Sequence, residues 1–81
     1  MVINMREEIL KSVIDIIVKE TEIEEDINGD SDLFDDLELS SLEIFTIFSL
    51  FEEKFGKKFS EKEISTIVTV NDIVDLIENK G

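Results

Sequence analysis

The chain contains no cysteine, histidine, proline, tryptophan or tyrosine among its 81 residues. Without cysteine it has neither a disulfide nor a thiol nucleophile, and without histidine it lacks the imidazole of serine and cysteine hydrolases. Its three glycines, at positions 29, 56 and 81, form no glycine-rich phosphate loop. No pair stands out among the 21 acidic residues as a general acid and base, so we predict that the chain is not an enzyme.

Basic residues are also scarce. The chain has 8 lysines and arginines but 21 aspartates and glutamates, which gives a net charge of −13. This charge disfavours nucleic acid and anionic membranes as partners and favours proteins with basic surfaces. Ile44 to Phe51, one of the two longest uncharged stretches, is too short to span a bilayer, and the N-terminus lacks a secretory signal pattern. We therefore expect a cytoplasmic monomer that binds neither nucleic acid nor membrane, and the absence of cysteine fits a reducing compartment.

Apolar residues recur with helical spacing, and no stretch has the alternation of a strand. The expected helices span residues 5–20, 41–55 or 41–56, 61–65 and 70–79. Residues 1–81 thus predict a single domain of the all-α class, a small bundle of three main helices plus one short helix.

Each helix has end signals or an apolar face. Asn4 with Glu7 is the expected cap of the first helix, whose stripe includes Met5, Val13 and Ile17. The other expected end signals are Ser60 with Glu63, Thr69 as an N-cap and Gly56 as a C-cap. The second helix has a wide apolar face, flanked by Phe45 and Leu50, that consists of Ile44, Ile47, Phe48, Phe51 and Phe55.

Residues 21–40 form an acidic, irregular segment in which nine of twenty residues are Asp or Glu. Apolar residues scattered along it suggest that the segment is pinned across the helices. Asp26, Asn28 and Asp30 fit the first positions of an EF-hand calcium loop. Later positions lack the required glycine and the bidentate glutamate, because Ser31, Phe34 and Leu37 occupy them. We therefore predict no specific metal site.

Ser41 stands between this acidic segment and the second helix. A hydroxyl at a helix N-terminus lies where backbone N–H groups and the helix dipole favour a phosphate. Local physics offers a plainer interpretation, in which Ser40 or Ser41 is only an N-cap, because Ser40 and Glu43 have capping-box spacing.

The chain resembles the acyl carrier proteins over nearly its whole length. Phe34-Asp35-Asp36-Leu37 and Ser41-Leu42-Glu43 match the two parts of the motif that precedes and opens the family's second helix. Residues 51–55, Phe-Glu-Glu-Lys-Phe, resemble the end of that helix, and Thr69-Val70 resembles the start of the last one.

The resemblance implies that Ser41 carries 4′-phosphopantetheine, transferred from coenzyme A by a phosphopantetheinyl transferase. The thiol of this arm would hold acyl groups as thioesters, so we expect a discrete acyl carrier for fatty-acid, polyketide or related specialised synthesis. Acyl-transferring or synthase enzymes with basic patches are the expected partners. The residues expected to be recognised by partners are Asp35, Asp36, Leu42, Glu43, Glu52 and Glu53.

Three positions depart from the family pattern. Ser40 replaces the usual Asp, Glu38 the usual Gly, and Thr46 an exposed acidic residue, which predicts a specialised rather than a housekeeping carrier. An aminoacyl, D-alanyl or peptidyl carrier and an unmodified acidic helical adaptor are the alternatives. Peptidyl carriers tend to have Gly-Gly before the serine, which is absent here. The apolar face of the second helix either admits part of an acyl chain or fills the core.

Overall fold

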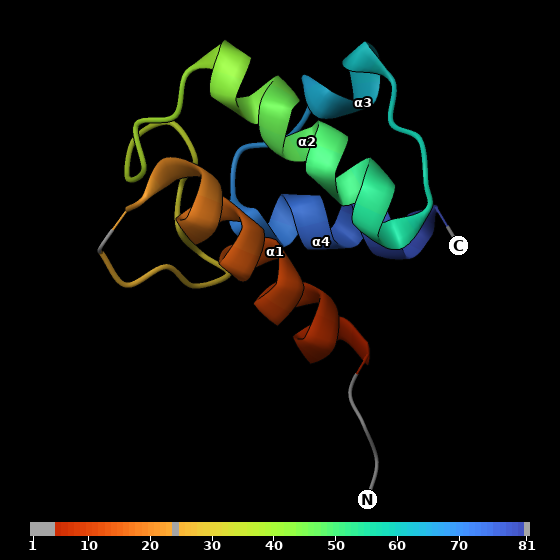
Figure 1. The fold of residues 1–81 in the computed structure, drawn as a ribbon, viewed down its shortest axis with the longest axis horizontal. Coiled ribbons are helices and arrows are strands. Elements are labelled where there is room, and N and C mark those ends of the chain that lie inside the picture. Colours follow the sequence, from red (N-terminus) through yellow and green to blue (C-terminus); the bar gives the residue numbers. More distant parts are fainter. Residues whose placement is uncertain (1–4, 24, 81) are drawn as a thin grey trace, which may run out of the picture.

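Four helices make up the computed structural model, which describes residues 5–23 and 25–80 (Figure 1). They are α1 (Met5–Thr21), α2 (Ser41–Phe55), α3 (Glu61–Ile64) and α4 (Val70–Asn79). The predicted all-α bundle of three main helices and one short helix is confirmed. Across the described ranges, the only strand-like pairing is a single antiparallel bridge between Asp32 and Thr69. No helix in this part of the chain has the length and apolar character needed to cross a bilayer.

Reciprocal caps set the starts of α2, α3 and α4. Ser40 accepts a hydrogen bond from the Glu43 N–H while Glu43 accepts one from the Ser40 N–H, and the predicted Ser60–Glu63 box has the same form. Thr69 caps α4 as predicted. The predicted C-cap of α2 is also present, because Gly56 adopts a positive φ of 67° that glycine tolerates without strain. The expected Asn4 cap lies outside the described residues.

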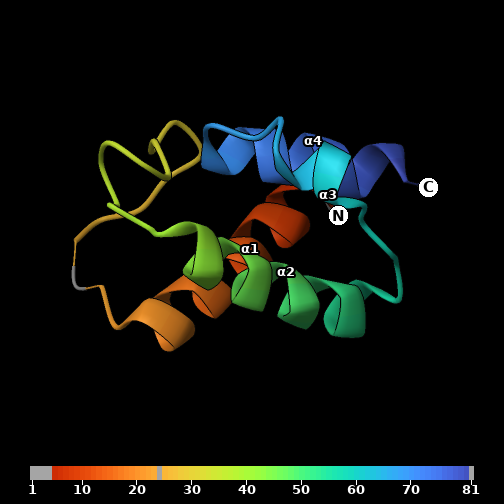
Figure 2. The same cartoon turned by 90° about the horizontal axis from the view of Figure 1, so that it is seen from above.

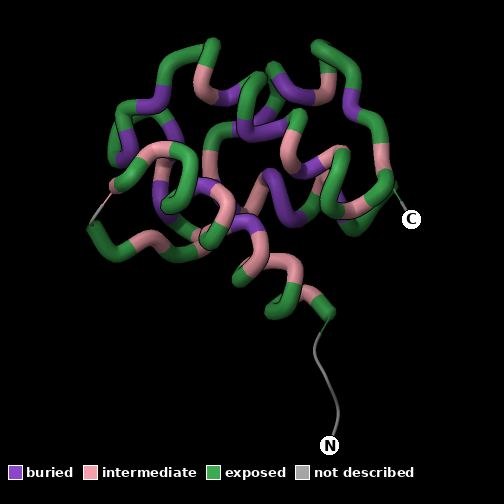
Figure 3. Tube along the Cα trace, in the orientation of Figure 1, coloured by how far each residue is buried: buried purple, intermediate pink, exposed green. Residues whose placement is uncertain are grey.

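The core lies between α1, α2 and α4 (Figures 2 and 3). The helix residues buried in it are Val13, Ile17, Ile44, Ile47, Phe48, Phe51, Ile64, Val70, Ile73, Val74 and Ile77. Met5 does not join them as the apolar stripe predicted, since it is 72% exposed. It occupies the first turn of α1, at the end that extends past the other helices in Figure 1.

The acidic segment between α1 and α2 is anchored, as predicted. Leu33, Leu37 and Leu39 are buried in the core, and the Leu33 N–H donates to the Val68 carbonyl at 2.8 Å. The other main-chain anchors are the Val70 N–H to the Ser31 carbonyl at 3.1 Å and the Asn71 N–H to the Gly29 carbonyl at 2.8 Å. The segment is therefore tied to the start of α4, a partner that the sequence pattern did not identify.

Ion pairs connect the outer surfaces of the helices. Arg6 of α1 bonds Asp75 at 2.6 Å and also Glu78, both on α4. Lys80 bonds Glu63 at 2.8 Å, and this hydrogen bond is the main reason that the pKa of Glu63 lies below its usual value. A lowered carboxyl pKa stabilises the fold at neutral pH, and this stabilisation is lost as the pH falls through the lowered value.

Candidate functional site

Ser41 is the first residue of α2, and its side chain is exposed. The two neighbouring hydroxyls differ in their contacts. The Ser40 Oγ accepts the Glu43 N–H at 3.2 Å, whereas the Ser41 Oγ has no hydrogen-bond partner within the described residues. A phosphate ester on Ser41 would lie beside the first-turn amides of a 15-residue helix, at the positive end of its dipole. The site therefore fits the phosphate of a phosphopantetheine arm.

The acidic turn before α2 is organised by its own carboxylates. Asp32 Oδ1 accepts the N–H groups of Phe34 and Asp35, both at 2.8 Å. Asp36 Oδ2 accepts the Asp32 N–H at 2.8 Å. One oxygen of Asp36 is thus used to hold the turn, whereas the exposed Asp35 carboxylate makes no hydrogen bond within the described residues and faces solvent. Asp35 is therefore the more accessible charge for a basic partner.

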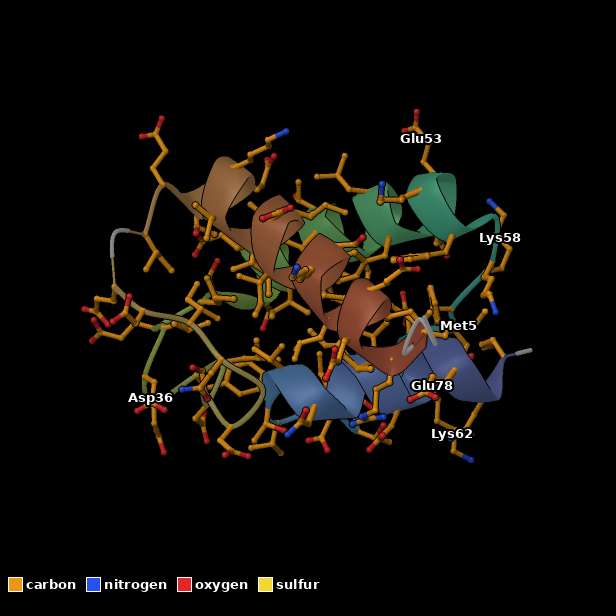
Figure 4. The ribbon with its side chains drawn as sticks, turned by 90° about the horizontal axis from the view of Figure 1, so that it is seen from below. Met5, Asp36, Glu53, Lys58, Lys62 and Glu78 are labelled. Atoms are coloured by element: carbon orange, nitrogen blue, oxygen red, sulfur yellow. The ribbon has the colours of Figure 1, made fainter. Side chains whose placement is uncertain are left out.

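The acidic residues of α2 divide into two groups. Glu43 lies in the first turn, near Ser41, although its carboxylate also accepts the Ser40 N–H at 2.9 Å. Glu53 lies twelve residues beyond Ser41, about 18 Å along the helix axis at 1.5 Å per residue. Figure 4 shows Asp36 and Glu53 at opposite ends of the molecule. Glu52 has a structural contact, because its Oε2 accepts the Phe59 N–H at 2.8 Å.

Two of the six expected recognition residues, Leu42 and Glu43, share the first turn of α2 with Ser41. Asp35 follows Phe34, which lines the same pocket as Ser41, whereas Asp36 lines a different pocket, with Glu22 and Glu38. Leu42 directly follows Ser41 and is 77% exposed, so it adds an apolar contact to an otherwise acidic surface. Glu52 and Glu53 belong to the far end of α2.

A small pocket of about 130 Å³ opens beside Ser41, between α2 and α3. It is lined by Phe34, Ser41, Ile44, Phe45, Ile64 and Ser65. Phe45 borders this pocket and is 43% exposed. Ile64 and Ser65 were not predictable as site residues from sequence, because no local pattern links α3 to the start of α2.

The three departures from the family motif have distinct structural roles. Ser40 is the N-cap of α2. Thr46 is exposed on α2, and its hydroxyl donates to the Leu42 carbonyl at 3.0 Å. Glu38 adopts a positive φ of 53°, so the chain keeps the left-handed conformation that suits glycine while having a side chain there.

We predict that Glu38→Gly raises the free energy of unfolding by about 0.5–1 kcal/mol, because glycine removes the left-handed strain but adds entropy to the unfolded chain. Urea denaturation measures the change. Glu38→Gln is the matched control, since it removes the charge and keeps the Cβ. Equal stabilisation by both variants would show that charge repulsion rather than backbone strain is responsible.

Comparisons with known proteins identify the family to which the chain is similar. The family model described as "Phosphopantetheine attachment site" matches residues 11–77. An acyl carrier protein of Coprothermobacter proteolyticus is 37% identical over 75 residues, which cover 91% of this chain and 92% of the relative. That of Thermotoga maritima is 37% identical over 76 residues, which cover 93% and 94%.

A solved structure of an acyl carrier protein has the same fold. The acyl carrier protein of Enterococcus faecalis superposes with a TM-score of 0.77 at 30% identity, over 94% of this chain and 98% of that chain. Members of this family are carriers rather than catalysts, and they carry a covalently attached 4′-phosphopantetheine. From its helices, its site and these relatives, the chain belongs to the acyl carrier protein family.

Proposed function

We propose that Ser41 is the attachment point of the phosphopantetheine arm. The observation that carries this assignment is the difference between the two adjacent hydroxyls. The Ser40 Oγ is engaged in the capping box, whereas the Ser41 Oγ is exposed at the helix N-terminus. When bound, the arm supplies a terminal thiol that holds an acyl group as a thioester. The first turn of α2 positions the phosphate end of the arm through its backbone amides.

The pathway served is fatty-acid, polyketide or related specialised synthesis in the cytoplasm. Ser40 and Thr46 support a specialised role, because each removes an acidic charge that the family motif places beside the attachment point or on exposed α2. Losing several acidic charges weakens electrostatic association with enzymes whose basic surfaces bind those charges. The loss of charge at two exposed positions therefore favours dedicated partners over housekeeping fatty-acid enzymes.

The partners are a phosphopantetheinyl transferase and acyl-transferring or synthase enzymes with basic patches. The sequence contains no basic residue between Lys19 and Lys54, so the whole segment from the end of α1 through most of α2 is free of positive charge. The exposed Asp35 and the apolar Leu42 both lie within six residues of Ser41. A basic surface with an apolar recess next to its catalytic groups is complementary to this end of the carrier.

We predict that Asp35→Lys lowers the kcat/KM for loading by a phosphopantetheinyl transferase by about three- to tenfold, because one exposed attraction of up to about 1 kcal/mol becomes a repulsion. Raising the salt concentration through the physiological range should reduce the rate for the wild type and narrow this difference. Asp15→Lys makes the same charge change at an exposed position on α1 and serves as the control. Equal effects of the two variants would mean that net charge alone governs the encounter.

The experiment that tests the proposed function is incubation of the purified chain with coenzyme A and a broad-specificity transferase, followed by intact mass measurement. We expect the mass to rise by one phosphopantetheine group per chain. A chain that stays unmodified, while a known carrier in the same tube is loaded, would contradict the proposal.

A further inference from the structure

The acidic segment between α1 and α2 contains an Asn-Gly pair at one of its main-chain anchors. Asn28 is exposed, and Gly29 directly follows it. The Gly29 carbonyl accepts the Asn71 N–H at 2.8 Å. Because Asn71 is the second residue of α4, its N–H has no carbonyl partner inside that helix. The bond to Gly29 therefore satisfies this N–H and ties the segment to α4.

The packing at this anchor favours glycine. A Cβ added at Gly29 would lie 2.4 Å from the Asn71 Oδ1, too close for the neighbour to stay in place. The Asn71 side chain is itself held, because its Nδ2 donates to Asp30 at 3.2 Å and its Oδ1 accepts from Arg6 at 3.5 Å. Asn28 is thus followed by the residue that leaves its own peptide nitrogen least shielded.

The groups that take part in the loss of an asparagine amide are accessible at this pair. Within residues 5–23 and 25–80, neither the Gly29 N–H nor the Asn28 Nδ2 makes a hydrogen bond. The Asn28 Oδ1 accepts the Asp30 N–H at 2.8 Å. A donor in that position stabilises the negative charge that develops on the oxygen when the side-chain carbon is attacked. The attacking nitrogen and the leaving nitrogen are therefore both unbonded, and the carbon between them is activated.

We propose that Asn28 is a site of spontaneous deamidation, with water as the only co-reactant, and that one product loosens the tie between the acidic segment and α4. The Gly29 nitrogen bonds to the Asn28 Cγ, and the bond from Cγ to Nδ2 breaks. Nδ2 takes up the proton of the Gly29 N–H and leaves as ammonia. Water then opens the cyclic imide at one of its two carbonyls. One opening gives aspartate, and the other gives isoaspartate, whose main chain runs through the former side-chain carboxyl carbon.

The two products differ in their effect on the fold. Aspartate keeps an oxygen that accepts the Asp30 N–H, and it adds one negative charge to a chain of net charge −13. Isoaspartate adds one carbon to the main chain directly before Gly29, which displaces the Gly29 carbonyl from the Asn71 N–H. The segment that leads to α2 then loses one of its anchors. This inference does not depend on where the phosphopantetheine arm is attached.

The first test incubates the full chain in warm, mildly alkaline buffer and follows it by peptide mapping with mass spectrometry. An isoaspartyl methyltransferase with S-adenosylmethionine labels the isoaspartate that forms. Asn71 and Asn79 are internal controls, because Asp72 and Lys80 rather than glycine follow them. We expect the amide to be lost fastest at Asn28, with isoaspartate among the products. Equal loss at the three positions, or a product without isoaspartate, would overturn the proposal.

Hydrogen exchange tests the structural consequence on the isolated isoaspartate product. Its Asn71 N–H should exchange about fivefold faster than in the fresh protein, the factor expected from the loss of one hydrogen bond. Asn28→Asp is the matched control, since it has the charge of the product and an unaltered main chain. Its Asn71 N–H should exchange at the wild-type rate. A wild-type rate in the isoaspartate product, or an equally raised rate in Asn28→Asp, would show that the altered main chain does not loosen this anchor.

Discussion

Ser41→Ala is expected to abolish loading of the phosphopantetheine arm. The variant removes the proposed acceptor oxygen, and no other hydroxyl occupies the same position at the start of α2. The Ser41 side chain makes no hydrogen bond to the described part of the chain, so the free energy of unfolding should change by less than about 0.5 kcal/mol. Intact mass measurement reports loading, and urea denaturation verifies that the variant is folded.

Ser40 provides the control for this prediction because it neighbours Ser41 but has a different role. Ser40→Ala should still be loaded, while loss of the N-cap lowers the free energy of unfolding by about 1 kcal/mol. Ser40→Asp should keep both loading and stability, since Asp caps helices as well as Ser does. Loading that persists in Ser41→Ala and disappears in Ser40→Ala would assign the arm to Ser40 instead.

The helices were predictable because their signals are local. Each capping box joins residues three apart, and the apolar faces repeat every three or four residues, so α2 and α4 begin and end where the sequence indicates. Met5 shows where this reasoning fails. Periodicity assigns it to the apolar face of α1, but burial depends on whether another element covers that turn, and Met5 is 72% exposed.

The site was predictable only in part, because local sequence signals do not show which distant elements pack together. The position of Ser41 at the start of α2 follows from the local pattern, and its proposed role as the attachment point comes from the family resemblance. The pocket depends on Ile64, which is 23 residues further along the chain and reaches Ser41 only through tertiary packing. The contact between the Phe48 and Phe59 rings could likewise not be predicted, because no local pattern in the sequence indicates that the two rings meet.

The acidic segment that leads to Ser41 depends on Leu33, and Leu33→Ala should lower the free energy of unfolding by about 3 kcal/mol. Leu33 is fully buried, and replacing a buried Leu by Ala costs about 2–5 kcal/mol through lost burial and the cavity left behind. An 81-residue domain has a total of only about 4–12 kcal/mol. Urea denaturation of the variant, with an unchanged m-value, is the measurement.

Phe34→Ala is the matched control, because the adjacent ring is larger but 44% exposed, so its removal should cost less than about 1 kcal/mol. Hydrogen exchange adds a second readout. The Leu33 amide, bonded to the Val68 carbonyl at 2.8 Å, should be protected in the wild type and should exchange faster in Leu33→Ala. If Leu33→Ala cost no more than Phe34→Ala, the segment would not be anchored through the core, and the acidic turn beside Ser41 would be held by its hydrogen bonds alone.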